Sequence, residues 1–419
     1  MRWKARRTGR RRRFAAAAVG AVTVALGTAS VLGATSGHTG ANIQMAANAQ
    51  AAALGGNWYG AAPYVMPFEN NPPDLGPVMS ATGQKSFQLA FILAPNGGGC
   101  SPTWDGTHSV SSDTQAKAMI DGIRAAGGDV TVSVGGYGGT KLGQTCGDPS
   151  STAAAYQQVI SKYGLKAIDF DLEEPEYENA AAIHNEIGAA KILQQNNAGL
   201  YVSITTAGTT GGEGTGWFGK QMLAEAKSQG FTPANYAIMP FDGGFNGSSA
   251  QISALEGFHS TLMSTFGWSS ANAYAHEGVS LMNGRSDTGE YFRQADFQAV
   301  LDYATSHGLS RYTYWSVNRD RQCDPPDNGQ TSGTCSSVAQ GAWDFTKYTA
   351  KFGGATPPTS PPPTDPPPGS CAAPVWNASA VYTGGMEVTY TKHTYKAKWW
   401  TQGETPGKAD VWADEGPCS

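Results

Sequence analysis

The chain has 419 residues, with 28 basic side chains, 33 acidic side chains and six cysteines. Its length allows two or three domains with a large buried core. Eight basic residues lie within residues 1–13, so the remainder carries 20 basic side chains against 33 acidic ones, a formal charge of −13. That balance excludes a basic patch for nucleic acid or for an anionic membrane surface.

Residues 1–40 are expected to be a secretory signal peptide. The basic stretch is followed by an Ala/Val/Leu-rich run from Phe14 to about Leu32 and then by small residues. A transmembrane anchor is the alternative, but the run is rich in Ala and Gly. The arginine-rich start permits both general and twin-arginine export, and the choice stays open. The protein is therefore expected to be secreted, with residues 41–52 as a flexible N-terminal segment and no membrane contact once the signal is removed.

Residues 53–354 alternate strand-like and helix-like segments. The candidate strands are residues 62–67, 87–93, 130–135, 166–173, 200–206, 236–241, 278–283 and 311–317. Helical patterns cover residues 113–126, 152–163, 179–195, 218–229, 250–266 and 295–307. Eight strands with intervening helices predict a (β/α)8 TIM barrel, because the glycine-rich phosphate turn of a doubly wound sheet is absent. In such a barrel the active site lies at the C-terminal ends of the strands.

Three carboxylates alternate with apolar residues in the fourth candidate strand: Asp169, Asp171 and Glu173. They share one face, roughly 6.6 Å apart. A solvated edge strand is the alternative, but no Lys, Ser or Thr lies among the acids. Like charges this close do not all ionise, so at least one pKa is expected to be raised, and Glu173 at the strand end becomes the candidate proton donor. One strand face cannot flank a glycosidic bond from both sides, so a nucleophile must come from the substrate or from elsewhere.

A stiff linker is predicted at residues 355–370, which contain eight prolines. It precedes residues 371–419, which carry seven aromatic residues between Cys371 and Cys418. A disulfide between these two cysteines is expected, because so small a module buries little surface. The adjacent Trp399 and Trp400 would face opposite sides of a strand, so that one can be core and the other exposed for stacking on a sugar.

The other four cysteines are paired by proximity, Cys323 with Cys335 and Cys100 with Cys146. Three connectivities are possible for four cysteines, so this pairing is a preference. The sequence has no Cys-x-x-Cys and no His-x-x-x-His, and neither a metal nor a cofactor is expected.

The spacing Asp169-x-Asp171-x-Glu173 resembles the catalytic motif of family 18 glycoside hydrolases, the chitinases. The resemblance implies that the N-acetyl oxygen of the sugar in the −1 subsite is the nucleophile, with net retention. It also implies that Glu173 is the general acid/base, that Asp171 orients the acetamido group, and that Asp169 shares a proton with Asp171.

Three further segments are similar to the family's motifs in the same chain order. Ser133-Val134-Gly135-Gly136 resembles Ser-x-Gly-Gly, which implies that Ser133 supports the inner aspartate. Met239-Pro240-Phe241-Asp242 resembles Met-x-Tyr-Asp, which implies that Asp242 contacts the acetamido group, beside Met239. Tyr314-Trp315-Ser316-Val317 resembles the last strand, which implies that Trp315 forms the floor of the −1 subsite.

One departure from the family pattern is Phe241, which stands where many members have a tyrosine. The expected hydroxyl would come from another side chain, such as Tyr312 or Tyr314, or this subgroup does without it.

The segment Ala397-Lys398-Trp399-Trp400-Thr401 resembles the motif of the small chitin-binding modules grouped as families 5 and 12. The resemblance implies a small all-β module that binds chitin through an exposed Trp399 with a tyrosine partner such as Tyr382.

Together these features predict a secreted, monomeric chitinase that acts on chitin and N-acetylglucosamine oligosaccharides. Residues 284–310 are too few to add a domain that walls the groove, which implies an open cleft and internal cutting. One alternative is a chitin-binding lectin on an inactive barrel. Another is an endo-β-N-acetylglucosaminidase that acts on glycoprotein glycans or on peptidoglycan.

Overall fold

The computed structural model describes residues 54–355, 373–378 and 380–418. The predicted signal peptide, the segment 41–52, residues 356–370 of the predicted linker and Cys371 lie outside the described residues. The disulfide between Cys371 and Cys418 therefore stays a prediction.

A ten-stranded sheet organises residues 54–355. Parallel neighbours follow one another in the order β1, β2, β5, β6, β7, β8, β9 and β12. Their bounds are Tyr64–Val65, Ser86–Leu93, Asp129–Gly135, Ala167–Leu172, Tyr201–Ala207, Asn235–Met239, Glu277–Met282 and Arg311–Trp315. All eight predicted strands are present, and their ends lie within two residues of the predicted ones. Nearly every residue of these strands is buried, as in parallel sheets that are covered on both faces.

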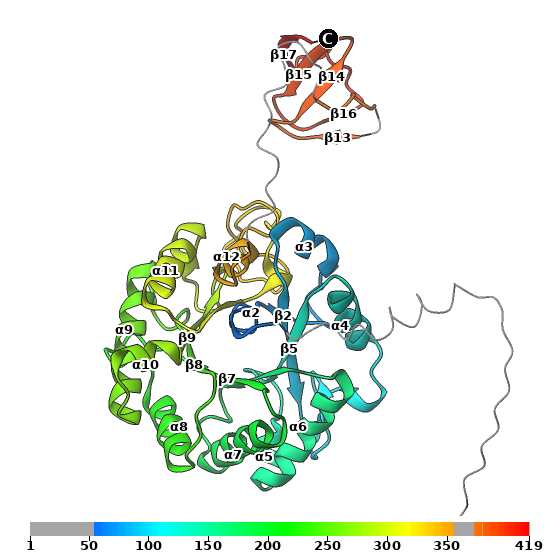
Figure 1. Cartoon of the computed structure of the whole chain (residues 1–419). Helices are drawn as coiled ribbons and strands as arrows, with labels where there is room; N and C mark the ends of the chain where they lie inside the picture. Colours follow the sequence, from blue (N-terminus) through cyan, green and yellow to red (C-terminus); the bar gives the residue numbers. More distant parts are fainter. Residues whose placement is uncertain (1–53, 356–372, 379, 419) are drawn as a thin grey trace, which may run out of the picture. The chain divides into compact units, whose positions relative to one another are not determined.

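The sheet curls on itself, and helices cover its outer side (Figure 1). Its first and last parallel strands, β1 and β12, are in contact. Thr313 of β12 donates a 2.5 Å hydrogen bond to the carbonyl of Ala62, just before β1. The C-terminal ends of the curled strands therefore lie around one mouth, which is where the site is built.

The helices of this α/β unit follow the strands in alternation, as predicted. Their bounds are α2 Gly56–Gly60, α3 Leu75–Thr82, α4 Gln115–Ala125, α5 Leu142–Thr145, α6 Pro149–Tyr163, α7 Ala180–Asn196, α8 Trp217–Ser228, α9 Gly247–Phe266, α10 Ser270–Ala275, α11 Gln294–His307 and α12 Thr346–Phe352, with 3-10 turns η1 Val110–Ser112 and η2 Val317–Arg319. Capping residues determine where several of these helices begin and end. The Asp148 carboxylate caps α6 at the backbone N–H of Ser151, and Gly164 ends that helix in the left-handed conformation.

Two short hairpins decorate the sheet near its mouth. Strands β3 (Thr103–Trp104) and β4 (His108–Ser109) extend the edge of β2 in antiparallel pairing. Strands β10 (Gly284–Arg285) and β11 (Tyr291–Phe292) form a separate hairpin after β9. The disulfide Cys100–Cys146 joins the loop after β2 to the end of α5, and Cys323–Cys335 closes the loop between η2 and α12. Both pairings are those expected from the sequence.

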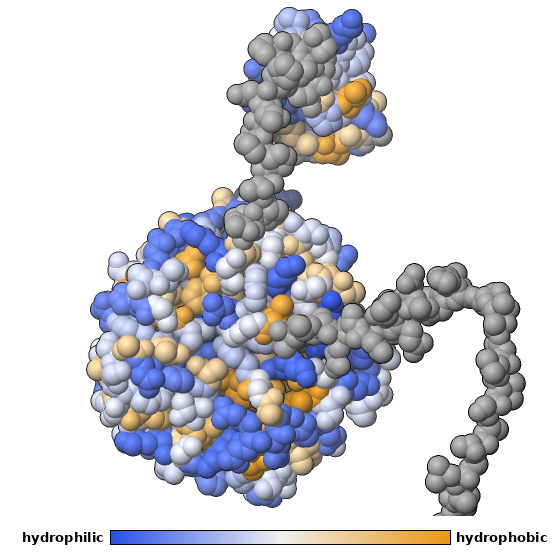
Figure 2. Space-filling model, in the orientation of Figure 1, coloured by the Kyte–Doolittle hydropathy of each residue, from blue (hydrophilic) through white to orange (hydrophobic). Residues whose placement is uncertain are grey.

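Within the described residues, no helix is both long enough and apolar enough to cross a bilayer. Hydrophilic and weakly polar side chains cover most of the face in Figure 2, and apolar side chains lie in small areas among them.

The C-terminal residues form a small β unit with its own core. Its strands are β13 Val381–Tyr382, β14 Glu387–Tyr390, β15 His393–Ala397, β16 Thr401–Gln402 and β17 Trp412–Pro417. β14, β15 and β17 form one antiparallel sheet, and β13 pairs with β16. The buried core contains Tyr382, Val388, Tyr395, Ala397, Val411 and Trp412.

Candidate active site

Strand β6 carries the two aspartates of the acid row into the interior of the curled sheet. Asp169 and Asp171 alternate with Ile168, Phe170 and Leu172, which pack among the buried apolar residues of the core. Glu173 follows the strand directly at its C-terminal end. The three acids therefore run from the interior toward the mouth, in the depth order that the alternation predicts.

The backbone beside β6 approaches the acid row too closely for a side chain. A Cβ on Gly135 of β5 would lie 2.1 Å from the carbonyl oxygen of Asp171, and Gly135 has a φ of +103°. The next residue, Gly136, donates its N–H to the same carbonyl at 2.8 Å. Both glycines of the Ser-x-Gly-Gly segment thus allow β5 and β6 to pack closely at the site.

Asp169 is fully buried and is the most heavily bonded carboxylate of the row. Its Oδ1 forms a 2.5 Å ion pair with Arg311, which is itself buried. Four further side chains donate to it at 2.6–3.0 Å, Gln88, Ser133, Ser203 and Thr205, and the Tyr64 hydroxyl lies 3.1 Å away. Ser133 thus contacts the inner aspartate, as the resemblance implied. Because an ion pair and four other donors satisfy this carboxylate, we assign it a supporting role and not a direct one in the chemistry.

Asp171 is also buried but has few partners. Its Oδ2 accepts a 2.8 Å hydrogen bond from the hydroxyl of Tyr64, and its Oδ1 has no hydrogen-bond partner among the described residues. Burial and then the charge of Asp169 raise the pKa of Asp171 to about 7, against the hydrogen bond from Tyr64 and the charges of Arg311 and Lys141. The structure has no direct hydrogen bond between the two aspartates. The Tyr64 hydroxyl lies against both of them instead.

Glu173 lines a cleft at the mouth of the sheet. Burial raises the pKa of its carboxyl well above the usual range, and the charges of Asp171 and Glu174 add to that effect. Lys141 acts in the opposite direction. A carboxyl with a raised pKa is suited to donate a proton, which is the role predicted for Glu173.

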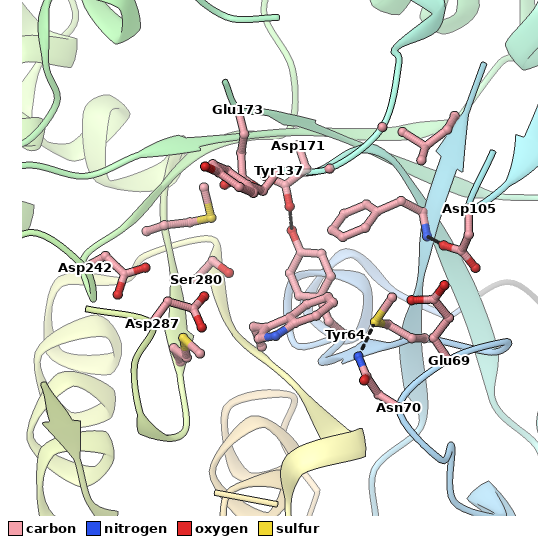
Figure 3. A pocket seen from close by; sticks show the side chains of 18 of the residues that line it. Tyr64, Glu69, Asn70, Asp105, Tyr137, Asp171, Glu173, Asp242, Ser280 and Asp287 are labelled. Atoms are coloured by element: carbon pink, nitrogen blue, oxygen red, sulfur yellow. Dashed lines mark hydrogen bonds between the residues drawn. The ribbon is translucent and has the colours of Figure 1, made fainter. Parts of the chain in front are cut away.

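The cleft has a volume of about 740 Å³. Acidic and aromatic side chains from several loops surround it (Figure 3). Its lining includes six of the predicted residues, Asp171, Glu173, Met239, Phe241, Asp242 and Trp315. Segments far apart in the sequence therefore meet around Glu173.

Trp315 ends β12 and presents part of its ring to the cleft. The indole stacks on Phe91 with the ring centroids 5.6 Å apart and an angle of 12° between the planes. Tyr64 meets the indole edge-on at 5.6 Å. Neighbouring aromatic rings therefore fix the orientation of Trp315 at the cleft.

Asp242 follows β8 and faces the cleft from the side opposite to Asp105 in Figure 3. Its Oδ1 accepts hydrogen bonds from both the backbone N–H and the hydroxyl of Thr288, at 3.0 and 3.1 Å. The β10–β11 hairpin that carries Thr288 also brings Asp287 to the cleft. This hairpin fixes Asp242 at the cleft edge.

The suggestion that Tyr312 or Tyr314 replaces the missing hydroxyl at Phe241 is wrong. Both tyrosines are completely buried on the outer face of β12. The Tyr312 hydroxyl donates to the carbonyl of Phe297, and the Tyr314 hydroxyl donates to Asp320. Successive side chains of a strand point to opposite faces, so a strand that directs Trp315 into the cleft directs Tyr314 and Tyr312 away from it.

The predicted binding residues of the C-terminal unit need two corrections. Tyr382 is not an exposed partner of Trp399: it is only 7% exposed, packs edge-on against Trp412, and donates its hydroxyl to Asn377 O. Trp399 and Trp400 do not divide between core and surface either, because they are 55% and 60% exposed. They follow the end of β15 in a bend, where the two-face alternation of a strand does not apply.

Several cleft residues were not predicted from the sequence. They include Tyr64, Glu69, Asn70, Phe91, Asp105, Tyr137, Ser280, Met282, Asp287 and Thr288. Tyr137 had a usable signal, because it directly follows the Ser-x-Gly-Gly segment. The β10–β11 residues had none, since two-residue strands leave no periodic pattern. In the described part of the chain no cluster of three or more His, Cys, Asp or Glu side chains is arranged to hold a metal ion.

Both the α/β unit and the C-terminal β unit are similar to known proteins. Residues 375–413 match the sequence profile of carbohydrate-binding module family 5/12. The chain is 28% identical over 276 residues to a probable bifunctional chitinase/lysozyme of Escherichia coli K12, which covers 62% of this chain and 30% of the relative. It is 28% identical over 276 residues to endochitinase 11 of Metarhizium anisopliae, and this match covers 62% of this chain and 52% of the relative.

Among solved structures, the catalytic domain of a hyperthermophilic chitinase from Pyrococcus furiosus is similar to the α/β unit. The TM-score is 0.62 at 25% identity, and the match covers 70% of this chain and 93% of that one. The chain spans about a third to a half of the length of the curated relatives. The α/β unit is thus similar in sequence and in fold to chitinase domains, which supports a glycoside hydrolase.

Proposed function

We propose that the protein is a chitinase that hydrolyses β-1,4 bonds between N-acetylglucosamine units, and that its curled sheet is a (β/α)8 barrel. The observation that carries this proposal is a single cleft that holds both a carboxyl with a raised pKa, Glu173, and a fixed aromatic surface, Trp315. An aromatic ring packs against the apolar face of a sugar, while an adjacent carboxyl can protonate the glycosidic oxygen. The names of the relatives support the same class of substrate.

In the proposed reaction Glu173 donates its proton to the glycosidic oxygen as the bond from that oxygen to C1 breaks. The N-acetyl oxygen of the same sugar attacks C1 and forms an oxazolinium ion. Water then attacks C1 from the side of the departed group and gives its proton to Glu173, which restores the carboxyl. Two displacements at C1 leave its configuration retained.

Asp171 is the group that we assign to the acetamido side of this reaction. Its Oδ1 is a hydrogen-bond acceptor without a partner among the described residues, so it can accept the acetamido N–H. Its negative charge would stabilise the positive charge that develops on the oxazolinium ring. The ion pair of Asp169 with Arg311 keeps a fixed negative charge below Asp171.

We further propose internal cutting of the chain. Between β9 and β12 the structure contains the small β10–β11 hairpin and α11, in described residues 283–310. This segment builds one edge of the cleft and is too short to roof it. The predicted open cleft is therefore consistent with the loops that line it.

The C-terminal unit is proposed to bind chitin and to hold the enzyme on the solid polymer. The exposed rings of Trp399 and Trp400 support this role, as does the match to carbohydrate-binding module family 5/12. Tethering raises the local concentration of the catalytic unit only on the polymer that the module binds. A basic and then apolar N-terminus and disulfide-bonded loops favour export, so we propose a secreted enzyme.

The test is a product analysis of the full chain with N-acetylglucosamine hexamers, in parallel with peptidoglycan and glycoprotein N-glycans. Cleavage of the hexamer at internal bonds, with β-anomeric products in the first minutes by proton NMR, supports the proposal. Inverted products would contradict the substrate-assisted route. Binding without cleavage would favour the lectin alternative, and cleavage only of glycans or of peptidoglycan would change the substrate.

A further inference from the structure

Lys141 is a buried cation directly behind the wall of the cleft. The residue is 1% exposed, and its side-chain nitrogen donates to the carbonyl oxygens of Tyr137, Gly138 and Gly139 at 3.3, 2.6 and 3.1 Å. A neutral amine has two N–H groups, whereas an ammonium has three. Three simultaneous acceptors therefore favour the charged form of Lys141.

The three carbonyls belong to a turn that forms part of the active cleft. Tyr137, Gly138 and Gly139 all line the cleft, and the Tyr137 ring is 73% exposed. Figure 3 shows this ring beside Glu173 and Asp171. One buried side chain thus holds the backbone of a turn whose outer surface faces the substrate.

The charge of Lys141 has no carboxylate in direct contact among the described residues. Its hydrogen bonds go to carbonyl oxygens alone, and it forms no ion pair there. Burying a cation without an ion-pair partner is costly. Burial lowers the pKa of Lys141, and the charges of Glu176, Glu173, Asp171 and Glu186 act in the opposite direction and raise it.

Two of these acids form a buried pair behind the turn. Glu186 accepts hydrogen bonds from the Tyr156 hydroxyl and from the Gly143 N–H, at 2.8 and 2.7 Å. Burial and then the charge of Glu186 raise the pKa of Glu176 well above its usual range. The other two acids that act on Lys141, Glu173 and Asp171, belong to the acid row and line the cleft.

We propose that Lys141 is a positioning residue of the hydrolytic site: its ammonium fixes the Tyr137–Gly139 turn over the cleft and provides the positive charge that faces Glu173 and Asp171 from inside the protein. The inference rests on the proposed hydrolysis, since it assigns a role in that reaction.

The charges around Glu173 give this role a measurable signature. Asp171 on β6, Glu174 beside it and Asp242 after β8 all raise the pKa of Glu173. Lys141, at the start of α5, is the cation that acts most strongly to lower it. Removing the ammonium must therefore raise the pKa of Glu173 further.

The experiment compares the full chain with Lys141→Met, Lys141→Arg and Tyr137→Ala. In Lys141→Met we expect the alkaline limb of the kcat/KM profile to move up by about one pH unit, with a lower kcat. Lys141→Arg keeps the charge, so the limb should stay near its wild-type position. Tyr137→Ala removes the ring from the same turn and should also leave the limb unchanged, which separates the charge from the shape of the turn.

A second measurement is independent of catalysis. Carbon-13 NMR titration of labelled glutamates, with the Glu173 signal assigned by its loss in Glu173→Gln, reads the pKa of Glu173 in wild type and in Lys141→Met. An upward shift supports the proposal even if the wild type does not cleave chitin, a result that would overturn only the proposed function. If Lys141→Met does not fold, Lys141→Met/Glu176→Gln also replaces a buried carboxyl with a neutral amide and provides the comparison. An unchanged pKa of Glu173 in a folded variant would overturn the role of Lys141.

Discussion

The hydroxyl of Tyr64 donates a 2.8 Å hydrogen bond to Oδ2 of Asp171 and lies 3.1 Å from Oδ2 of Asp169. Tyr64 belongs to β1 and both aspartates belong to β6, so the contact crosses the interior of the curled sheet. It is the one hydrogen bond to the Asp171 side chain among the described residues. Tyr64 of β1 therefore holds the side chain of Asp171, the middle acid of the row, by a hydrogen bond.

Tyr64→Phe should change the pH dependence of the reaction. The hydrogen bond stabilises the ionised form of Asp171, so its loss should raise the pKa of Asp171 above its value of about 7. Because the proposed mechanism needs Asp171 as an anion, the acidic limb of kcat/KM should move up by about one pH unit.

The matched control is Tyr312→Phe, which removes a buried hydroxyl that donates to the carbonyl of Phe297, away from the cleft. Each variant should lose about 1 kcal/mol of unfolding free energy. Only Tyr64→Phe should move the pH profile. Identical profiles for Tyr64→Phe and wild type would contradict the role given to this hydrogen bond.

The order of elements in the α/β unit was predictable because each strand is a compact apolar run. The fourth strand was expected at residues 166–173 and spans Ala167–Leu172. Helix α3, Leu75–Thr82, was not predicted, because Gly76 and Pro77 in its first turn obscure its pattern. The hairpins β3–β4 and β10–β11 were missed because their strands are two residues long.

The site was predictable where a motif lies on a strand, because the side chains of neighbouring strand residues point alternately to the two faces. The position of Trp315 in the cleft already implied that Tyr314 faces the other way, so that error was avoidable. Lys141 and Thr288 could not be found in this way. Their roles depend on loops that meet only in the folded chain, as the contact between Thr288 and Asp242 illustrates.

Replacing each aspartate by asparagine should change the free energy of unfolding in opposite directions. Asp169→Asn leaves Arg311 as a buried cation without its ion-pair partner, which should cost about 3–5 kcal/mol of unfolding free energy. Asp171 has a raised pKa, so the folded state resists its ionisation, and its contribution to stability falls as the pH rises from about 4 to about 7. At pH 8 Asp171→Asn should therefore be neutral or stabilising.

Urea unfolding of both variants at pH 5 and pH 8 checks this contrast. The difference between Asp171→Asn and wild type should shift toward stabilisation at the higher pH. A large loss of stability in Asp171→Asn, equal to that in Asp169→Asn, would show that the two acids are held alike.

Trp399→Ala and Trp400→Ala should weaken binding to solid chitin. Each ring exposes more than half of its surface on the C-terminal unit. Loss of one sugar-stacking ring should lower affinity about tenfold, as measured by depletion from suspensions of chitin. Hydrolysis of soluble hexamers should stay unchanged.

The control for these variants is Val381→Ala, an apolar side chain of the same unit that is 47% exposed. It should bind like wild type. Equal losses in all three variants would indicate a general effect on the unit and not stacking on sugar.

The central claim is that Glu173 transfers the proton. Its most direct test is the hydrolysis rate of N-acetylglucosamine hexamers by Glu173→Gln, beside Glu178→Gln as a neighbouring exposed glutamate. We expect Glu173→Gln to lower kcat by about 10²–10⁴-fold, with hexamer binding by calorimetry retained and Glu178→Gln at the wild-type rate. Wild-type kcat in a folded Glu173→Gln variant would contradict the account.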